Sequence, residues 1–99
     1  MMNPFELLKN MDKIKSQAEE MKAKVATIKC SGYAYGNMIE AVANGNMEIE
    51  SLRIDPSIVK EENRSMLEVL VASAVNTALK NVKERVSQEA GQALSQYGI

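Results

Sequence analysis

The sequence has no histidine and no tryptophan, and only one cysteine and one phenylalanine among its 99 residues. Without histidine, Ser-His-Asp and Cys-His catalysis and histidine-bound zinc are excluded, together with the commonest acid–base group near neutral pH. A single cysteine excludes an intramolecular disulfide and a cysteine-cluster metal site, and it fits a reducing cytoplasm better than a secreted protein. The composition therefore offers few ways to build a catalytic or metal site.

Long hydrophobic runs are also absent. The longest uncharged stretch, Val69 to Leu79, is too short to span a bilayer. Glu6 and Lys9 interrupt the N-terminal region before an apolar run forms, so we expect neither a signal peptide nor a membrane anchor. Hydrophobic residues make up 45% and charged residues 25% of the chain, which is typical of a globular protein, and the length fits one domain over residues 1–99.

A long amphipathic helix is predicted over residues 3–29. Asn3 suits the N-cap, Pro4 the first helical position, and Glu6 completes a capping box. Apolar residues then recur at alternating steps of four and three, which is typical of a coiled-coil seam. The helix would be roughly 40 Å long, so we expect it to protrude from a small domain and to need a partner helix. The seam positions are Leu7, Met11, Ile14, Ala18, Met21, Val25 and Ile28.

Three short strands are predicted next, over residues 29–35, 38–43 and 47–54. Gly32 and Gly36 are expected at bends or bulges of the first strand. Together the strands would form a small antiparallel meander whose edges need covering or pairing.

The loop and the third strand carry two further signals. Asn44-Gly45 favours a type I′ hairpin turn between the second and third strands. The apolar alternation of the third strand changes phase between Ile49 and Leu52. Such a change indicates a β-bulge, or a strand with contacts on both faces.

A second long helix is predicted over residues 61–90, followed by a frayed tail over residues 91–99. Glu61 and Glu62 suit the positive end of its dipole, and several small residues permit close helix approach. The order α-β-β-β-α places the chain in the α+β class, with a small antiparallel three-stranded sheet between two long helices. One short chain cannot cover both helix seams and both sheet faces, so we expect a homodimer.

This order and three local features resemble the YbaB/EbfC family of nucleoid-associated DNA-binding proteins. The features are the Asn44-Gly45 turn, the step Ile54-Asp55-Pro56-Ser57, and the leucine- and alanine-rich run from Met66 to Ala78 that contains Asn76. The resemblance covers the chain from Asn3 to about Glu89.

The resemblance implies a homodimer whose sheets join at the centre and whose helices project as paired coiled-coil arms. It implies binding to double-stranded DNA, a change in DNA shape, and a role in nucleoid organisation or gene regulation in the bacterial cytoplasm. It also implies no enzyme activity and no cofactor, metal or small-molecule substrate. It carries over no individual DNA-contacting residue, so the candidate site rests on charge and periodicity.

The clearest positive line is a seven-residue repeat of lysines along one flank of the first helix: Lys15, Lys22 and Lys29. At about 100° per residue these side chains lie beside the apolar seam, spaced about 10 Å along the axis, where they could contact phosphates. Lysines in such positions also cover apolar surface and pair with acids of a partner helix, so both roles stay open.

A second group of cations lies in the second helix: Lys80, Lys83 and Arg85. It could contact DNA from the distal part of a projecting helix, or reflect the usual preference for cations in the C-terminal half of a helix. The balance of 12 basic and 13 acidic residues, with a net charge of −1, argues against strong DNA binding unless the acids gather at the centre and the lysines on the arms.

Other polar groups have simpler interpretations. Glu40, Glu48 and Glu50 could gather as a carboxylate cluster, although solvated strand faces explain them better. Cys30 is expected to be a half-buried strand residue. The leading hypothesis is a DNA-binding protein of low sequence specificity; the alternative is a prefoldin-like chaperone or protein adaptor with coiled arms.

Overall fold

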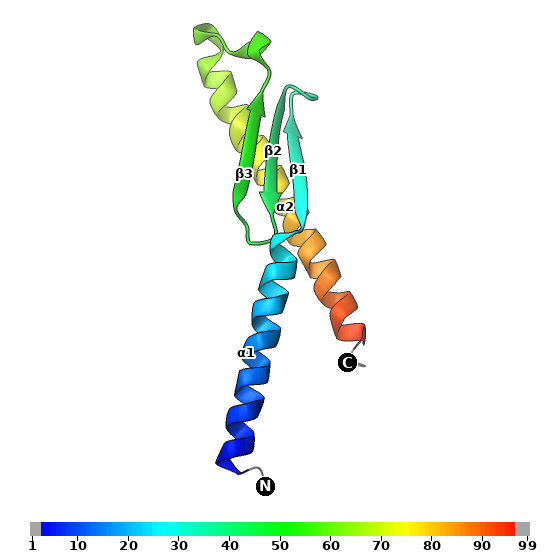
Figure 1. The fold of residues 1–99 in the computed structure, drawn as a ribbon. Coiled ribbons are helices and arrows are strands. Elements are labelled where there is room, and N and C mark those ends of the chain that lie inside the picture. The colour runs from blue at the N-terminus through cyan, green and yellow to red at the C-terminus, as the bar shows by residue number, and fades with distance from the viewer. Residues whose placement is uncertain (1–2, 97–99) are drawn as a thin grey trace.

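The computed structural model describes residues 3–96 and has the predicted order of a helix, three strands and a second helix (Figure 1). Two short 3-10 helices, η1 (Pro56–Ile58) and η2 (Glu61–Asn63), connect the sheet to the last helix. The α+β class with α-β-β-β-α order is therefore confirmed. The three antiparallel strands lie on one side of the last helix, and the first helix projects beyond the end of the sheet (Figure 1).

Helix α1 (Pro4–Ala26) begins as its sequence predicts. The side chain of Asn3 accepts a hydrogen bond of 2.8 Å from the backbone N–H of Glu6, which satisfies one of the free donors of the first turn. The helix ends three residues earlier than the prediction, because the backbone and hydroxyl of Thr27 both donate to the carbonyl of Lys24. Lys29 consequently belongs to the sheet and not to the helix.

The sheet consists of β1 (Lys29–Ala34), β2 (Ile39–Asn44) and β3 (Ile49–Ile54), in that order. The phase change in β3 corresponds to a bulge: Val42 pairs with Ser51, whereas Ala43 pairs with Ile49. Glu50 is the extra residue. Because of this extra residue, Ile49 and Leu52 lie on the same face of the sheet. Their cross-strand partners on that face are Ala43 and Ala41.

The prediction of a type I′ turn at Asn44-Gly45 is wrong. Such a turn needs positive φ at both central residues, but the left-handed residue of this loop is Met47, at φ 64°. The side chain of Asn44 holds the loop instead, by accepting the backbone N–H groups of Asn46 and Glu48. Gly45 is required for another reason: a Cβ there would collide with the backbone of Val25, at the end of α1.

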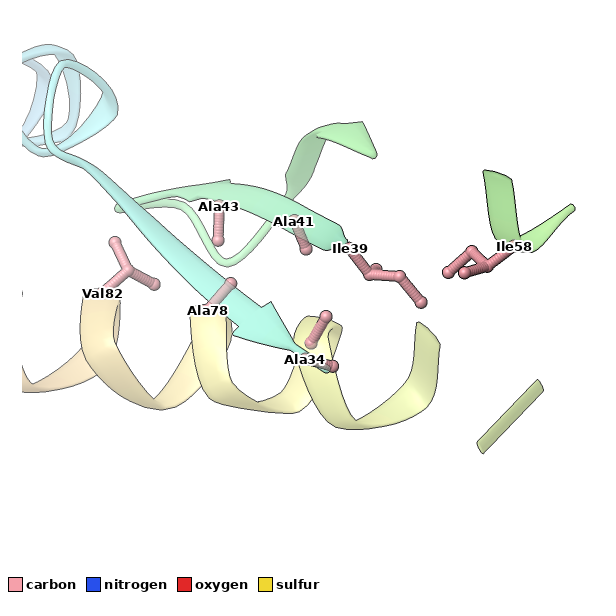
Figure 2. Packing of buried hydrophobic residues seen from close by; sticks show 8 residues of the cluster. Ala34, Ile39, Ala41, Ala43, Ile58, Ala78 and Val82 are labelled. Atoms are coloured by element: carbon pink, nitrogen blue, oxygen red, sulfur yellow. The ribbon is translucent and has the colours of Figure 1, made fainter. Parts of the chain in front are cut away.

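Helix α2 (Arg64–Gln96) crosses one face of the sheet and forms the core with it. Figure 2 shows the alanine, isoleucine and valine side chains that fill this space. Beyond the predicted end near residue 90, the helix continues through Gly91 to Gln96, so the expected frayed tail is helical over residues 91–96. Residues 97–99 of that tail lie outside the described residues. The buried side chains are Ala34, Ile39, Ala41, Ala43, Ile58, Ala74, Ala78 and Val82.

The closest approach in the core is between β1 and α2. A Cβ on Gly32 would collide with the carbonyl of Ala74 and the backbone N–H of Ala78. Gly32 therefore lies in a regular strand and not at the predicted bend, and its missing side chain lets two backbones touch. Beside this contact, the side-chain amide of Asn81 donates to the carbonyl of Ser31 at 3.0 Å.

Much of the chain lies outside this core. No residue of α1 is buried, and the molecule extends over 70 × 23 × 16 Å. Its radius of gyration is 19.8 Å, against about 13 Å for a compact domain of this length. The predicted protrusion of the first helix is thus confirmed, and α1 forms an arm attached to the sheet by its last turn (Figure 1).

Replacing Gly32 by Ala should destabilise the protein strongly. The new methyl group meets backbone atoms, which cannot turn away as a side chain could. We expect a loss of about 3 kcal/mol in the free energy of unfolding, measured by urea denaturation. The control is Gly91→Ala in exposed helix, where nothing lies within 4 Å of an added Cβ; a gain of about 0.5–1 kcal/mol is expected there. Equal stability of Gly32→Ala and wild type would contradict the close packing of β1 on α2.

Candidate nucleic-acid interface

The arm α1 displays the lysine line that the sequence predicts, but only in part. Lys15 and Lys22 lie two turns apart on the exposed surface of the helix, and neither forms an ion pair with another described residue. Lys29, the third member, begins β1, so it is not part of the helix face. The continuous helical edge is therefore formed by Lys15 and Lys22, which we call the lysine edge.

Lys29 is bound to an acid of the sheet. Its Nζ lies 3.1 Å from Oε1 of Glu50, the bulge residue of β3. The hydrogen bond from Lys29, followed by one from Asn44, lowers the pKa of the Glu50 carboxyl below its usual value. The pair is exposed, so it contributes little to stability. It does neutralise the sheet acid nearest to Lys29 at the base of the arm.

The three cations predicted as a cluster on the second helix are separated by the structure. Ala78 and Val82 face the sheet, so at about 100° per residue Lys80 and Lys83 point away from it and Arg85 points to the sheet side. Lys80 and Lys83 line a shallow hollow of about 460 Å³ on the outer surface of α2. Lys80, Lys83 and Arg85 are close in sequence but do not form one cluster, because one and a half helical turns place them on different sides of α2.

Arg85 instead lies at the junction between α2 and the end of α1. It lines a hollow of about 440 Å³ together with Lys24, Lys29 and Glu89. Its Nε lies 3.4 Å from Oε1 of Glu89, one turn along the helix. The structure thus gathers three cations around the base of the arm, with two acids among them.

Lys24 is a member of this junction that sequence reasoning missed. Periodicity places it on the opposite flank of α1 from the lysine edge, and Arg85 is 61 positions away. No local pattern in the sequence links the two. Only the angle at which α1 leaves the sheet brings them into the same hollow.

The seam of α1 meets α2 at the junction. An apolar cavity of about 170 Å³ separates the two helices there, lined on one side by Met21, Val25 and Ile28 and on the other by Val86 and Ala90. Towards its N-terminal end the seam is uncovered, and Met11 and Ile14 are more than half exposed. The last turns of α1 therefore face α2 across this cavity, and the rest of the arm diverges from α2 into solvent (Figure 1).

The outer face of the sheet has a different electrostatic character. Oε2 of Glu40 accepts hydrogen bonds from the hydroxyls of Tyr33, at 2.8 Å, and Ser31, at 3.1 Å. These bonds, with Arg53 nearby at 3.6 Å, lower the pKa of the Glu40 carboxyl. Arg53 also donates to the carbonyl of Asn37 at 2.7 Å. Because the arginine is engaged with this acid, the face presents no unpaired positive charge to phosphates.

The predicted alternative of a carboxylate cluster is not found. Glu40 and Glu50 are bound to different cations on different strand pairs. Among residues 3–96, no three acids or cysteines come together in a way that could hold a metal ion. Within the same range, neither helix combines the length and the apolar character needed to cross a membrane.

Comparison with known proteins identifies the family to which this chain is similar. Residues 1–97 match the model of the YbaB/EbfC DNA-binding family. A nucleoid-associated protein of Clostridium kluyveri is 36% identical over 87 residues, covering 88% of this chain and 76% of that protein. One from Dictyoglomus thermophilum is 30% identical over 91 residues, covering 92% of this chain and 88% of that protein.

A solved structure shares the fold. The uncharacterized protein HP0035 from Helicobacter pylori superposes with a TM-score of 0.75 over 95% of this chain and 99% of its own, at 24% identity. The family match spans nearly the whole sequence, and the same order of helices and strands is seen in the structure. The chain therefore belongs to the YbaB/EbfC DNA-binding family.

Proposed function

We propose that this protein is a non-enzymatic, nucleoid-associated protein that binds duplex DNA in the bacterial cytoplasm and acts as a homodimer. Membership of the DNA-binding family and the names of its relatives support the first part. This membership favours DNA over the client proteins of a prefoldin-like chaperone. The observation that carries the proposal is the lysine edge, on an arm with no buried residue.

The lysine edge explains how a chain of net charge −1 can attract DNA. The sheet acids Glu40 and Glu50 are engaged with Arg53 and Lys29, whereas Lys15 and Lys22 keep their charge available at a distance from them. Lysines on phosphates supply affinity without reading bases. Binding should therefore be of modest strength, strongly salt-dependent and of low sequence specificity.

The surface area supports a homodimer. The chain exposes 7532 Å², whereas a compact monomer of 10.9 kDa exposes about 5,600 Å². A stable protein interface buries about 800 Å² on each partner, so the excess is large enough for one. Part of this excess is the arm, and part is the sheet face that α2 leaves uncovered.

The uncovered sheet face belongs to β3. Helix α2 packs on β1 and β2, and Leu52 and Ile49, which share the core-facing side of β3, remain 44% and 38% exposed. On the side of α2 next to them runs a half-buried apolar stripe formed by Val71, Val75 and Leu79. The strand and the stripe form two walls of an open apolar corner. A second copy, related by a two-fold axis, would fill this corner with the same residues.

An apolar groove lies at the end of the sheet where β3 passes into η1. It has a volume of about 590 Å³, and Val59, Leu67 and Val71 supply its apolar lining beside four charged residues, Lys60, Glu61, Arg64 and Glu68. Val71 also belongs to the apolar stripe of α2, so the groove continues the same surface. The proposed dimer interface therefore comprises β3, the stripe and the groove, and leaves the lysine edge outside it.

Reversing the charge of the lysine edge should abolish most DNA binding. For Lys15→Glu/Lys22→Glu we expect the affinity for a duplex to fall more than about tenfold at low salt, and the slope of log K against log salt to become shallower by about two or more. Fluorescence anisotropy at about 50 and 200 mM salt measures both quantities.

The matched control is Lys13→Glu/Lys24→Glu, which makes the same change in net charge on the same helix but outside the lysine edge. It should weaken binding much less. Thermal unfolding and the molecular mass must be unchanged in both variants. Equal losses in the two variants would mean that DNA responds only to overall charge, and the assignment of the lysine edge would be wrong.

A charge placed on β3 should separate the dimer. Leu52→Asp puts a carboxylate into the apolar corner, so we expect the mass by light scattering to change from twice 10.9 kDa to 10.9 kDa. Ser51→Asp adds the same charge to the opposite face of the same strand and should remain dimeric. The thermal midpoint of the wild type should also rise with protein concentration. A wild type that stays monomeric at micromolar concentration would refute the dimer.

A further inference from the structure

The end of α1 farthest from the sheet carries two large apolar side chains that the coiled-coil seam does not explain. Phe5 is 69% and Leu8 60% exposed. With Ile14 at 0° and an advance of about 100° per residue, Leu8 lies near 120° and Phe5 near 180°, whereas the seam is centred near 10°. A helix packed on the seam would therefore leave both exposed.

Leu8 continues the lysine edge. It lies seven residues before Lys15, as Lys15 lies seven before Lys22. Lys22, Lys15 and Leu8 thus follow one another along one edge of the arm towards its N-terminus, at intervals of about 10 Å. Phe5 lies one turn beyond Leu8, at the end of the helix. A DNA backbone that follows the lysine edge leads to these two side chains.

The surroundings of Phe5 suit a polyanion. The ammonium of Lys9 lies 5.4 Å from the centre of the Phe5 ring, so a cation accompanies the aromatic group. Two acids are near: Glu6 is turned about 100° away from Phe5, whereas Asp12 lies near 160°, between the directions of Leu8 and Phe5 and one turn along the helix from Leu8. A protein helix that docked here would have to present acidic side chains to Lys15 and Lys22.

We propose that Phe5 and Leu8 form an apolar wedge that enters a base step of DNA held by the lysine edge. DNA-bending proteins use this arrangement: cations contact the phosphates, and apolar side chains partly unstack a step and kink the duplex. The inference rests on the proposed function and gives it a mechanism, since lysine contacts to phosphates do not by themselves unstack a base step. In a dimer, two such wedges act on the same or on neighbouring duplexes.

The first test separates bending from binding. Phe5→Ala/Leu8→Ala, in the full chain, should bind a duplex of about 30 bp with an affinity within about threefold of wild type, because the phosphate contacts remain. The bend measured by energy transfer between dyes on the two DNA ends should fall to less than about half. Leu7→Ala/Met11→Ala removes two apolar side chains of the same turns on the seam side and should keep the bend.

A second test uses the absence of tryptophan. Phe5→Trp introduces a single tryptophan, whose fluorescence should be quenched on addition of duplex DNA because the indole stacks on bases. Leu7→Trp, on the seam, is the matched reporter and should change much less.

The outcomes distinguish the two proposals. Normal bending by Phe5→Ala/Leu8→Ala, or equal quenching of both tryptophan reporters, overturns the wedge and leaves DNA binding intact. A change in the oligomeric mass of Phe5→Ala/Leu8→Ala would show that the end of the arm contacts another copy, and this also overturns the wedge. A wild type without salt-dependent DNA binding overturns the proposed function itself.

Discussion

The contact on which the rest of the structure depends is the approach of the β1 backbone to the α2 backbone at Gly32. No side chain fits between them, so the neighbouring core positions are filled mainly by alanines, and the helix lies unusually near the sheet. This proximity limits how far α2 can reach. It covers β1 and β2, and β3 keeps apolar side chains such as Leu52 in solvent. The uncovered apolar surface to which we assign the proposed dimer interface is thus linked to the smallest residue in the core.

Helix α1 is attached to the rest of the molecule only near its C-terminal end. Helix α1 covers none of the core, and its apolar seam faces α2 only at the cavity lined by Val86. The helix is fixed by its last turn, where Gly45 lets the β2–β3 loop lie directly on the backbone of Val25. An arm held in this way presents most of its length to a ligand. The chain uses this length to keep its free lysines apart from the acids of the sheet.

Separation of charge, and not its total, decides whether such a protein can bind DNA. Basic and acidic residues nearly balance in number, yet Glu40 and Glu50 are each engaged with a cation of the sheet. The lysine edge has no such partner among the described residues. The arm itself carries five lysines and four acids, so a phosphate backbone beside it meets a small excess of positive charge. Salt screens the acids of the sheet beyond about one Debye length.

Periodicity and local turn chemistry were sufficient to predict the order of the elements, the cap at Asn3 and the bulge of β3, since these depend on neighbours within a few residues. They also predicted the lysine repeat, but not that the helix would stop at Ala26 and leave Lys29 in the sheet. Contacts between distant residues decided the rest: the role of Gly32 and Gly45, the separation of Lys83 from Arg85, and the meeting of Arg85 with Lys24. Such contacts depend on how α1 and α2 are angled against the sheet, and no local pattern in the chain encodes those angles.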